Sequence, residues 1–172
     1  RGDDAISPDE TVRVLLKVAE AVDFAHSRGI IHQDIKPANI MVGEYGEALL
    51  VDWGTARDLG DDERSMGGSP TGSPAYMSPE QARCESTDQR SDVYALGATL
   101  FHALLHRHPI ATTSPEEFWE RKRAGHVDVP TDDEMQQAPA PLVSIALKAM
   151  AAAPGDRYQS AREFGDDLKS YQ

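Results

Sequence analysis

The chain has 172 residues, 40% of them hydrophobic and 27% charged, which is an ordinary composition for one soluble globular domain. Its net charge of −12 argues against a surface that binds nucleic acid or an anionic membrane. The lone Cys84 excludes an internal disulfide, and no stretch approaches the roughly 20 apolar residues of a membrane helix. We therefore expect a cytoplasmic protein, although a parent protein could carry an anchor elsewhere.

Helical patterns account for most of the chain. Ser7, Pro8 and Glu10 predict a helix start with a capping box, and the apolar spacing that follows predicts a helix stopped by a left-handed cap at Gly29. A helix over residues 91–105 is apolar on most faces, which places it at the centre of the fold. Further helices are predicted over residues 114–124, over 141–152 and from 160 onward.

The remaining segments predict one small hairpin and several loops. Short strands at 40–42 and 48–51, joined by a turn, would bring the residue after the second strand close to the start of the first. Residues 55–78 indicate a long loop, and 128–140 a polar loop with prolines. The acidic runs 60–63 and 132–134 are interpreted as solvated loop. The fold class is therefore mainly α with a small β-hairpin.

One short loop and the end of the hairpin hold the groups that phosphate chemistry needs. Asn39 and Asp52 are oxygen donors suited to a hard ion such as Mg²⁺, Asp34 can face a nucleophile, and Lys36 can offset transferred negative charge. Taken singly, each of these residues is also common in ordinary turns or on surfaces. Their spacing favours the functional interpretation.

Five motifs, in the same order, resemble those of eukaryotic-type (Hanks-type) protein serine/threonine kinases in their bacterial style. Residues 32–39 resemble the catalytic loop of that family, and 52–54 (Asp-Trp-Gly) resemble its metal-binding triplet. Residues 72–80 resemble the end of the activation segment, which runs over 52–80. Residues 91–97 resemble the buried helix behind the catalytic loop, and 156–158 contain the family's late arginine.

The resemblance assigns chemical roles to five residues. Asp34 would accept or orient the proton of the substrate hydroxyl, and Lys36 would neutralise the transferred phosphoryl group and marks serine/threonine specificity. Asn39 and Asp52 would hold the Mg²⁺ that bridges the phosphates of ATP. Met41 would lie under the adenine ring.

The resemblance also assigns structural roles. His32 and Trp53 would join the apolar stack that aligns two lobes, with Gly54 completing the metal triplet. Asp92 would accept hydrogen bonds from the catalytic-loop backbone and suits the start of a helix. The motifs further predict a buried ion pair that anchors the activation segment, formed by Glu80 and Arg157.

Two departures from the family pattern carry consequences. Gln33 stands where regulated kinases have an arginine that gathers an activation-loop phosphate, and glutamine cannot do this. Ser73, in place of the usual threonine, keeps a hydroxyl that can bond the two catalytic side chains. The first departure predicts that activation does not depend mainly on phosphorylation of Thr55, Ser65, Ser69, Thr71 or Ser73.

Three histidines form a second candidate metal site. His102 and His106 are one helical turn apart and His108 follows closely, but no cysteine or carboxylate completes a ligand set nearby. A solvated helix end is the favoured interpretation.

By resemblance, residues 1–172 match the family's larger, carboxyl-terminal lobe. This sequence contains neither the glycine-rich phosphate loop nor the lysine strand of the small N-terminal lobe, so we expect the isolated chain to be nearly inactive. The face around Met41 and Trp53, which would meet that lobe, is expected to be an apolar patch. Self-association through this face, or by exchange of the 55–78 loop, is a further expectation.

The expected function is ATP-dependent phosphorylation of serine and threonine hydroxyls on protein substrates. Its partners would be ATP, the protein substrate and the missing lobe, with no nucleic acid. The alternative is a non-catalytic kinase-like binding module, which would need none of Asp34, Lys36, Asn39 and Asp52. A small-molecule phosphotransferase is a third possibility, against which the substrate-platform motif at 72–80 counts.

Overall fold

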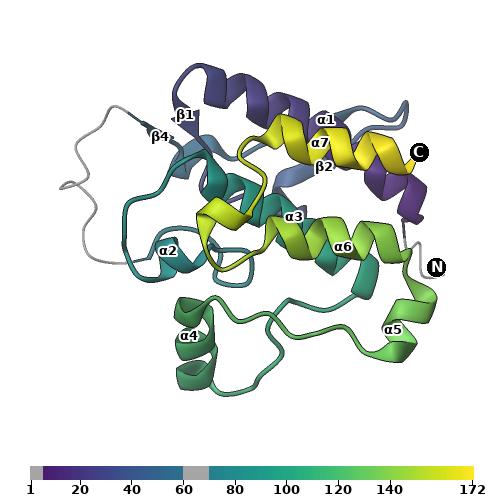
Figure 1. The fold of residues 1–172 in the computed structure, drawn as a ribbon. Helices are drawn as coiled ribbons and strands as arrows, with labels where there is room; N and C mark the ends of the chain where they lie inside the picture. The colour runs from purple at the N-terminus through teal and green to yellow at the C-terminus, as the bar shows by residue number, and fades with distance from the viewer. Residues whose placement is uncertain (1–5, 60–69) are drawn as a thin grey trace.

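Helix α3 (Gln89–Leu105) runs through the middle of the molecule, and the other helices pack around it (Figure 1). The computed structural model describes residues 6–59 and 70–172. Side chains on all faces of α3 are buried, among them Tyr94, Leu96, Leu100 and Phe101. This confirms the predicted central position, because a helix that is apolar all round requires cover on every side.

Three helices form most of the cover. Helix α1 (Pro8–Ser27) lies against α7 (Ala161–Tyr171), and α6 (Ala140–Ala149) packs on α3 (Figure 1). The α3–α6 contact is close because Gly97 has no side chain: a Cβ there would lie 2.5 Å from the Cβ of Ala149. This packing fixes the position of α3 against α6.

The helix ends follow local rules. Ser7 Oγ accepts a hydrogen bond from Glu10 N at 3.2 Å, and Gly29 is left-handed with φ +78°, as predicted. The structure forms only this half of the predicted capping box at α1. Ser114 caps α4 (Pro115–Ala124) and Ser160 caps α7 in the same way. Two shorter helices complete the set, α2 (Pro79–Ala82) and α5 (Asp132–Gln137).

The strands form two small antiparallel pairs. Strands β2 (Ile40–Val42) and β3 (Ala48–Leu50) make the predicted hairpin, with Met41 opposite Leu49. Strand β1 (Ile30–Ile31) pairs with β4 (Arg57–Asp58). The second pair ties the start of the catalytic loop (residues 32–39) to the chain that follows the metal triplet (residues 52–54). The other end of the loop continues into strand β2 of the hairpin, so backbone hydrogen bonds hold the chain at both ends of the loop.

Four sequence expectations need correction. The segment 128–140 is not all loop: Thr131 and Glu134 form a complete capping box that starts α5, so the acidic run 132–134 is helical. The long loop over 55–78 contains strand β4. Helix α6 ends at Ala149, earlier than predicted, and α3 begins two residues before the predicted start, where Asp88 caps it. The acidic run 60–63 lies outside the described residues.

No helix in the described ranges, 6–59 and 70–172, combines the length and the apolar character that spanning a membrane requires.

Candidate active site

Asp34 lies at the centre of a small polar cluster. Its Oδ2 accepts from Lys36 Nζ at 2.7 Å, and its Oδ1 accepts from the backbone N–H of Ser73 at 2.7 Å. Burial acts to raise the pKa of the Asp34 carboxyl, but the hydrogen bonds from Lys36 and Ser73 together outweigh it and hold this pKa below its ordinary value. Asp34 is therefore an anion at neutral pH.

Lys36 connects the catalytic loop to the later part of the activation segment. Its Nζ donates to Ser73 Oγ at 2.6 Å as well as to Asp34. The Ser73 hydroxyl thus makes the predicted bond to Lys36, whereas Asp34 is bonded by the Ser73 backbone N–H. The ammonium is only partly buried, so it can still meet a negatively charged group from solvent.

Asn39 is oriented by Asp34 itself. Residues Pro37–Asn39 form a turn of 3-10 helix, and the buried Asn39 Nδ2 donates to Asp34 O at 2.8 Å and to Asp34 Oδ2 at 3.3 Å. With the amide nitrogen used in this way, the amide oxygen is the atom that can act as a ligand. The backbone of Asn39 also meets the hairpin, because Val51 N donates to Asn39 O at 2.9 Å.

Asp92 supports the catalytic loop from below, as predicted. It is the fourth residue of α3, is almost fully buried, and accepts from the backbone N–H groups of His32 and Gln33 at 2.8 Å each. His26, on α1, lies 2.8 Å from the same carboxylate through Nε2. One buried side chain thus fixes the loop relative to two helices.

Gln33 has a left-handed backbone with φ +70° and a buried side chain that donates to Thr87 Oγ1 at 3.0 Å. Arg57 donates to the same threonine, at 2.8 Å to its carbonyl and 3.0 Å to its hydroxyl. The side chain of Gln33 is therefore committed to a neutral contact and does not face solvent as a phosphate receptor would.

The metal-triplet residues sit at the end of the hairpin. Asp52 is left-handed (φ +60°, ψ +69°), a conformation that costs roughly 1–2 kcal/mol for a residue with a side chain and that is enriched at functional sites. Its exposed carboxylate accepts from Gly54 N at 3.4 Å. The Trp53 ring packs edge-on against His32 at 4.6 Å between centroids, and Thr55 Oγ1 donates to His32 O.

The donor set at Asn39 and Asp52 fits Mg²⁺. It offers one amide oxygen and one exposed carboxylate, both hard oxygen ligands. Among residues 6–59 and 70–172, no three His, Cys, Asp or Glu side chains gather as a metal site by themselves. Two protein ligands completed by phosphate oxygens and water are the usual way in which Mg²⁺ is held with a nucleotide.

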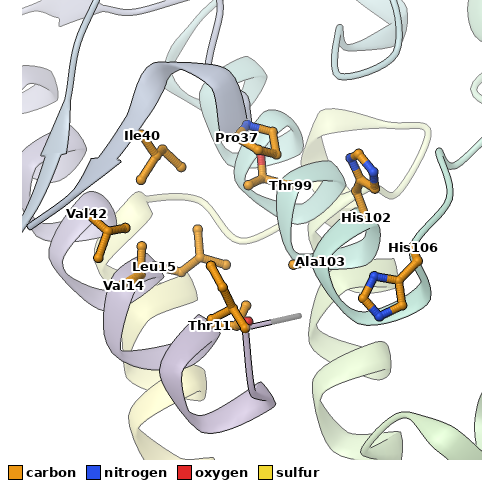
Figure 2. A pocket seen from close by; sticks show the side chains of 11 residues that line it. Thr11, Val14, Leu15, Pro37, Ile40, Val42, Thr99, His102, Ala103 and His106 are labelled. Carbon is orange, nitrogen blue, oxygen red and sulfur yellow. The ribbon is translucent and has the colours of Figure 1, made fainter. Parts of the chain in front are cut away.

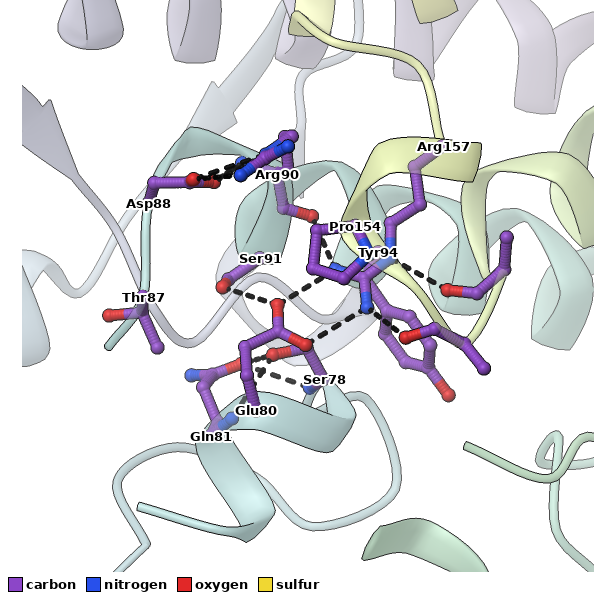
Figure 3. A network of polar contacts seen from close by, with 12 residues as sticks. Ser78, Glu80, Gln81, Thr87, Asp88, Arg90, Ser91, Tyr94, Pro154 and Arg157 are labelled. Atoms are coloured by element: carbon purple, nitrogen blue, oxygen red, sulfur yellow. Dashed lines mark hydrogen bonds and ion pairs between the residues drawn. The ribbon is translucent and has the colours of Figure 1, made fainter. Parts of the chain in front are cut away.

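Glu80 and Arg157 form the predicted buried ion pair, shown with its surroundings in Figure 3. The two Arg157–Glu80 distances are 2.7 and 2.9 Å, and Ser91 Oγ donates to Glu80 at 2.7 Å. Burial acts to raise the pKa of Glu80, but the hydrogen bond and charge of Arg157 hold it below the ordinary value. Arg157 also donates to the carbonyls of Arg90, Ala151 and Ala152.

Gln81 is a site residue that the sequence analysis missed. Its Nε2 donates to Gln33 O at 2.9 Å and to Thr71 O at 3.2 Å, so it ties the activation segment to the catalytic loop. Gly72 passes so close that a Cβ there would lie 2.6 Å from Gln33 O. The signal was present: Ser78 and Gln81 have the spacing of a capping box, which the structure forms.

The histidine interpretation holds only in part. His106 and His108 are exposed, as expected for a solvated helix end. His102, however, is half-buried, and its Nδ1 lies 2.6 Å from the Tyr76 hydroxyl. Burial lowers the pKa of His102 below its ordinary value, so the neutral ring is favoured. It is therefore a packed partner of the activation segment and not a solvated residue.

The face of the hairpin is exposed and apolar, as predicted. Met41 and Leu49, which lie opposite each other in the hairpin, are 59% and 61% exposed, and Trp53 is 39% exposed. A separate pocket of about 660 Å³ lies between the start of α1, strand β2 and the end of α3 (Figure 2). None of the predicted catalytic or metal-binding residues is among the eleven described side chains that line it.

Comparisons with known proteins agree with this geometry. The protein kinase domain family matches residues 1–163, and the chain belongs to that family. It is 38% identical over 169 residues to the probable serine/threonine-protein kinase PknB of Bifidobacterium longum. It is 36% identical to the serine/threonine-protein kinase PknB of Mycolicibacterium smegmatis, over 168 residues, and to that of Mycobacterium tuberculosis, over 165.

These matches confirm the resemblance to bacterial Hanks-type kinases that the motifs predicted. The alignments cover 97%, 96% and 95% of this chain but 24%, 27% and 26% of the respective relatives. The chain thus spans about a quarter of the length of the curated relatives that it matches.

Proposed function

We propose that this chain is the larger, carboxyl-terminal lobe of a protein serine/threonine kinase, which phosphorylates serine and threonine hydroxyls on protein substrates with ATP. The observation that carries this proposal is the cluster of Asp34, Lys36, Asn39 and Ser73. It gathers an ionised carboxylate, a cation and an amide oxygen on one loop, which is the set that in-line phosphoryl transfer needs.

The geometry supports a division of labour between two residues. Asp34 is an acceptor held from both sides, so a substrate hydroxyl that donates to it would be oriented for attack. Because its pKa lies below the ordinary value, Asp34 is a weak base and would take the proton only as the oxygen–phosphorus bond forms. Lys36 would exchange its bond to Ser73 for one to the transferred phosphoryl group.

Asn39 and Asp52 would hold Mg²⁺, which when bound neutralises charge on the phosphates of ATP. Val51, whose N–H bonds the Asn39 carbonyl, fixes the spacing between the two ligands. Met41 would contact the adenine ring, since it is exposed on the hairpin face. The same face would receive the small lobe.

The 172-residue chain on its own would be nearly inactive. Phosphoryl transfer depends almost entirely on positioning and electrostatic stabilisation, and this sequence supplies only part of the nucleotide grip. Isothermal titration of the chain with Mg-ATP is expected to show weak binding at best. Tight binding would contradict this.

The direct test is a kinase assay on the complete kinase domain that contains this chain. Asp34→Asn is expected to lower kcat by 100-fold or more with a small change in the KM for ATP, because it removes the acceptor but keeps the shape. Asp133→Asn, at an exposed position on α5, is the matched control and is expected to keep full activity. Absence of phosphoryl transfer by the natural domain, with no more activity than Asp34→Asn, would overturn the proposal in favour of a binding module.

We further propose that activation-loop phosphorylation is not the main switch of this kinase. Gln33 supplies no cation, and its side chain is held by Thr87. Phosphatase treatment of the purified kinase domain is expected to change its turnover less than about threefold. A loss of two or more orders of magnitude would contradict this.

A further inference from the structure

Helix α4 carries a lysine that is almost completely buried. Lys122 is 1% exposed, and its Nζ lies 3.0 Å from Met77 O, 3.3 Å from Ala75 O and 3.5 Å from Tyr94 Oη. The Tyr94 and Phe118 rings lie 5.2 and 5.9 Å from the same nitrogen. All of these contacts are with uncharged groups.

Packing alone does not account for a lysine at this place. Lysine is rarely buried without a charged partner, and an apolar side chain of similar length would fill the slot without the desolvation of an ammonium. Burial lowers the pKa of Lys122 to about 7, while burial raises that of Tyr94, which stays neutral. In either charge state Nζ keeps at least two N–H donors for the two carbonyls.

Those two carbonyls belong to the segment that leads to the catalytic cluster. Ala75 and Met77 flank Tyr76, and the amides of Tyr76 and Met77 both donate to Ser73 O, at 3.0 and 3.1 Å. Ser73 in turn bonds Asp34 and Lys36. A continuous chain of hydrogen bonds therefore runs from Lys122, through one turn of the activation segment, to the catalytic pair.

Helix α4 is itself held in place by contacts with two neighbouring segments. Gly125, at its end, is left-handed and so close to the chain after α6 that a Cβ there would lie 2.5 Å from the Cβ of Ala152. Arg83 donates to Arg123 O at 2.6 Å, which joins α4 to the end of α2. The Lys122 backbone is thus held from two sides.

We propose that Lys122 is a positioning residue for the protein substrate: through Ala75 O and Met77 O it holds the segment on which the substrate chain lies at a fixed distance from Asp34. This rests on the proposed kinase function. Its effect is expected in the capture of the protein substrate more than in the binding of ATP or in the chemical step, because Lys122 touches neither.

Kinetics of the complete kinase domain test this. Lys122→Met, which fills the slot without donors, is expected to raise the KM for a peptide substrate about tenfold while kcat and the KM for ATP change less than threefold. Lys169→Met, at an exposed lysine of α7, is the matched control and is expected to leave all three constants unchanged. An unchanged KM for the peptide, or an equal loss in every constant, would overturn the proposal.

Hydrogen exchange on this 172-residue chain tests the positioning without any activity. In Lys122→Met, protection of the Tyr76 and Met77 amides is expected to fall at least tenfold, with α1 and α3 unchanged. Unchanged protection overturns the proposal. If Lys122→Met loses protection locally but the natural kinase domain is inactive, the positioning role of Lys122 stands. Only the proposed kinase function is then overturned.

Should Lys122→Met fail to fold, Lys122→Gln, which keeps N–H donors on a shorter side chain, replaces it in the same measurement. The same local loss of protection is expected, because the shorter side chain cannot reach both carbonyls. Full protection in that variant also overturns the proposal.

Discussion

Replacing Arg157 by methionine should reveal how the molecule depends on its buried ion pair. Arg157→Met keeps most of the side-chain volume but leaves the Glu80 carboxylate almost fully buried, with Ser91 Oγ as its remaining hydrogen-bond donor from a side chain. Breaking a buried pair in this way costs about 3–5 kcal/mol. That is a large share of the roughly 5–15 kcal/mol that stabilises an ordinary domain.

The matched control is a second arginine of the same chain. Arg162 pairs with Asp23 at 3.1 Å, but its side chain is 75% exposed. Exposed ion pairs contribute at most about 1 kcal/mol, so Arg162→Met is expected to change stability little. Urea denaturation at pH 7, followed by circular dichroism, measures both variants.

The pH dependence supplies a sharper test, because the sign of the effect should reverse. In the natural chain the pKa of Glu80 lies below its ordinary value of 4.5, so its contribution is present above about pH 4.5 and is lost as the pH falls through the folded-state pKa. In Arg157→Met the charge and hydrogen bonds of the guanidinium are gone, while burial, the largest influence on Glu80, remains and raises its pKa. The free energy of unfolding of that variant should therefore increase between pH 7 and 5, relative to the natural chain.

The double variant decides whether the pair acts as a unit. Glu80→Gln combined with Arg157→Met removes both charges, so it is expected to be more stable than Arg157→Met alone. If the two single losses simply add, or if Arg157→Met costs less than 1 kcal/mol, the reasoning from the buried charge is refuted.

Three further predictions concern packing, proton binding and association. Gly97→Ala would place a methyl carbon 2.5 Å from a side-chain carbon of α6, so urea denaturation should show a loss of about 1–3 kcal/mol. Gly155→Ala, with nothing within 4 Å, should change stability little, and equal losses would contradict the packing argument. Because burial lowers the pKa of Lys122 to about 7, only the unfolded chain holds that proton between about pH 7 and 10.5. The free energy of unfolding should therefore rise with pH across this window, and more in the natural chain than in Lys122→Met; equal slopes in denaturation series would refute this. Light scattering at high concentration should detect dimers, fewer of them when Met41 and Leu49 are both changed to lysine, whereas a monomer throughout would contradict association through this face.

Local chemistry made much of the fold predictable. The N-caps at Ser7, Ser114 and Ser160 and the left-handed Gly29 depend on residues within one turn of each other, so sequence spacing was sufficient to find them. Helix α5 was missed although its capping box, Thr131 with Glu134, is equally local. The polar, proline-punctuated sequence around it predicts a loop and obscures the cap.

The candidate site likewise has contacts that the sequence predicts and contacts that it does not. Asp34, Lys36 and Asn39 lie within six residues, and the hairpin register that follows carries Asp52 back toward them, so their proximity could be foreseen. The engagement of Gln33 with Thr87 could not, since no local pattern relates residues 54 positions apart.

The sequence by itself determined which groups are present for phosphate chemistry and which segments are helical, because both depend on neighbours along the chain. Only the tertiary structure decided that Lys122 is buried beneath Ala75 and Met77, and that the side chain of Gln33 is held by Thr87. Burial and pairing of this kind arise when α3, α4 and the activation segment pack together. They are properties of that packing, in which residues distant in sequence exclude water from one another.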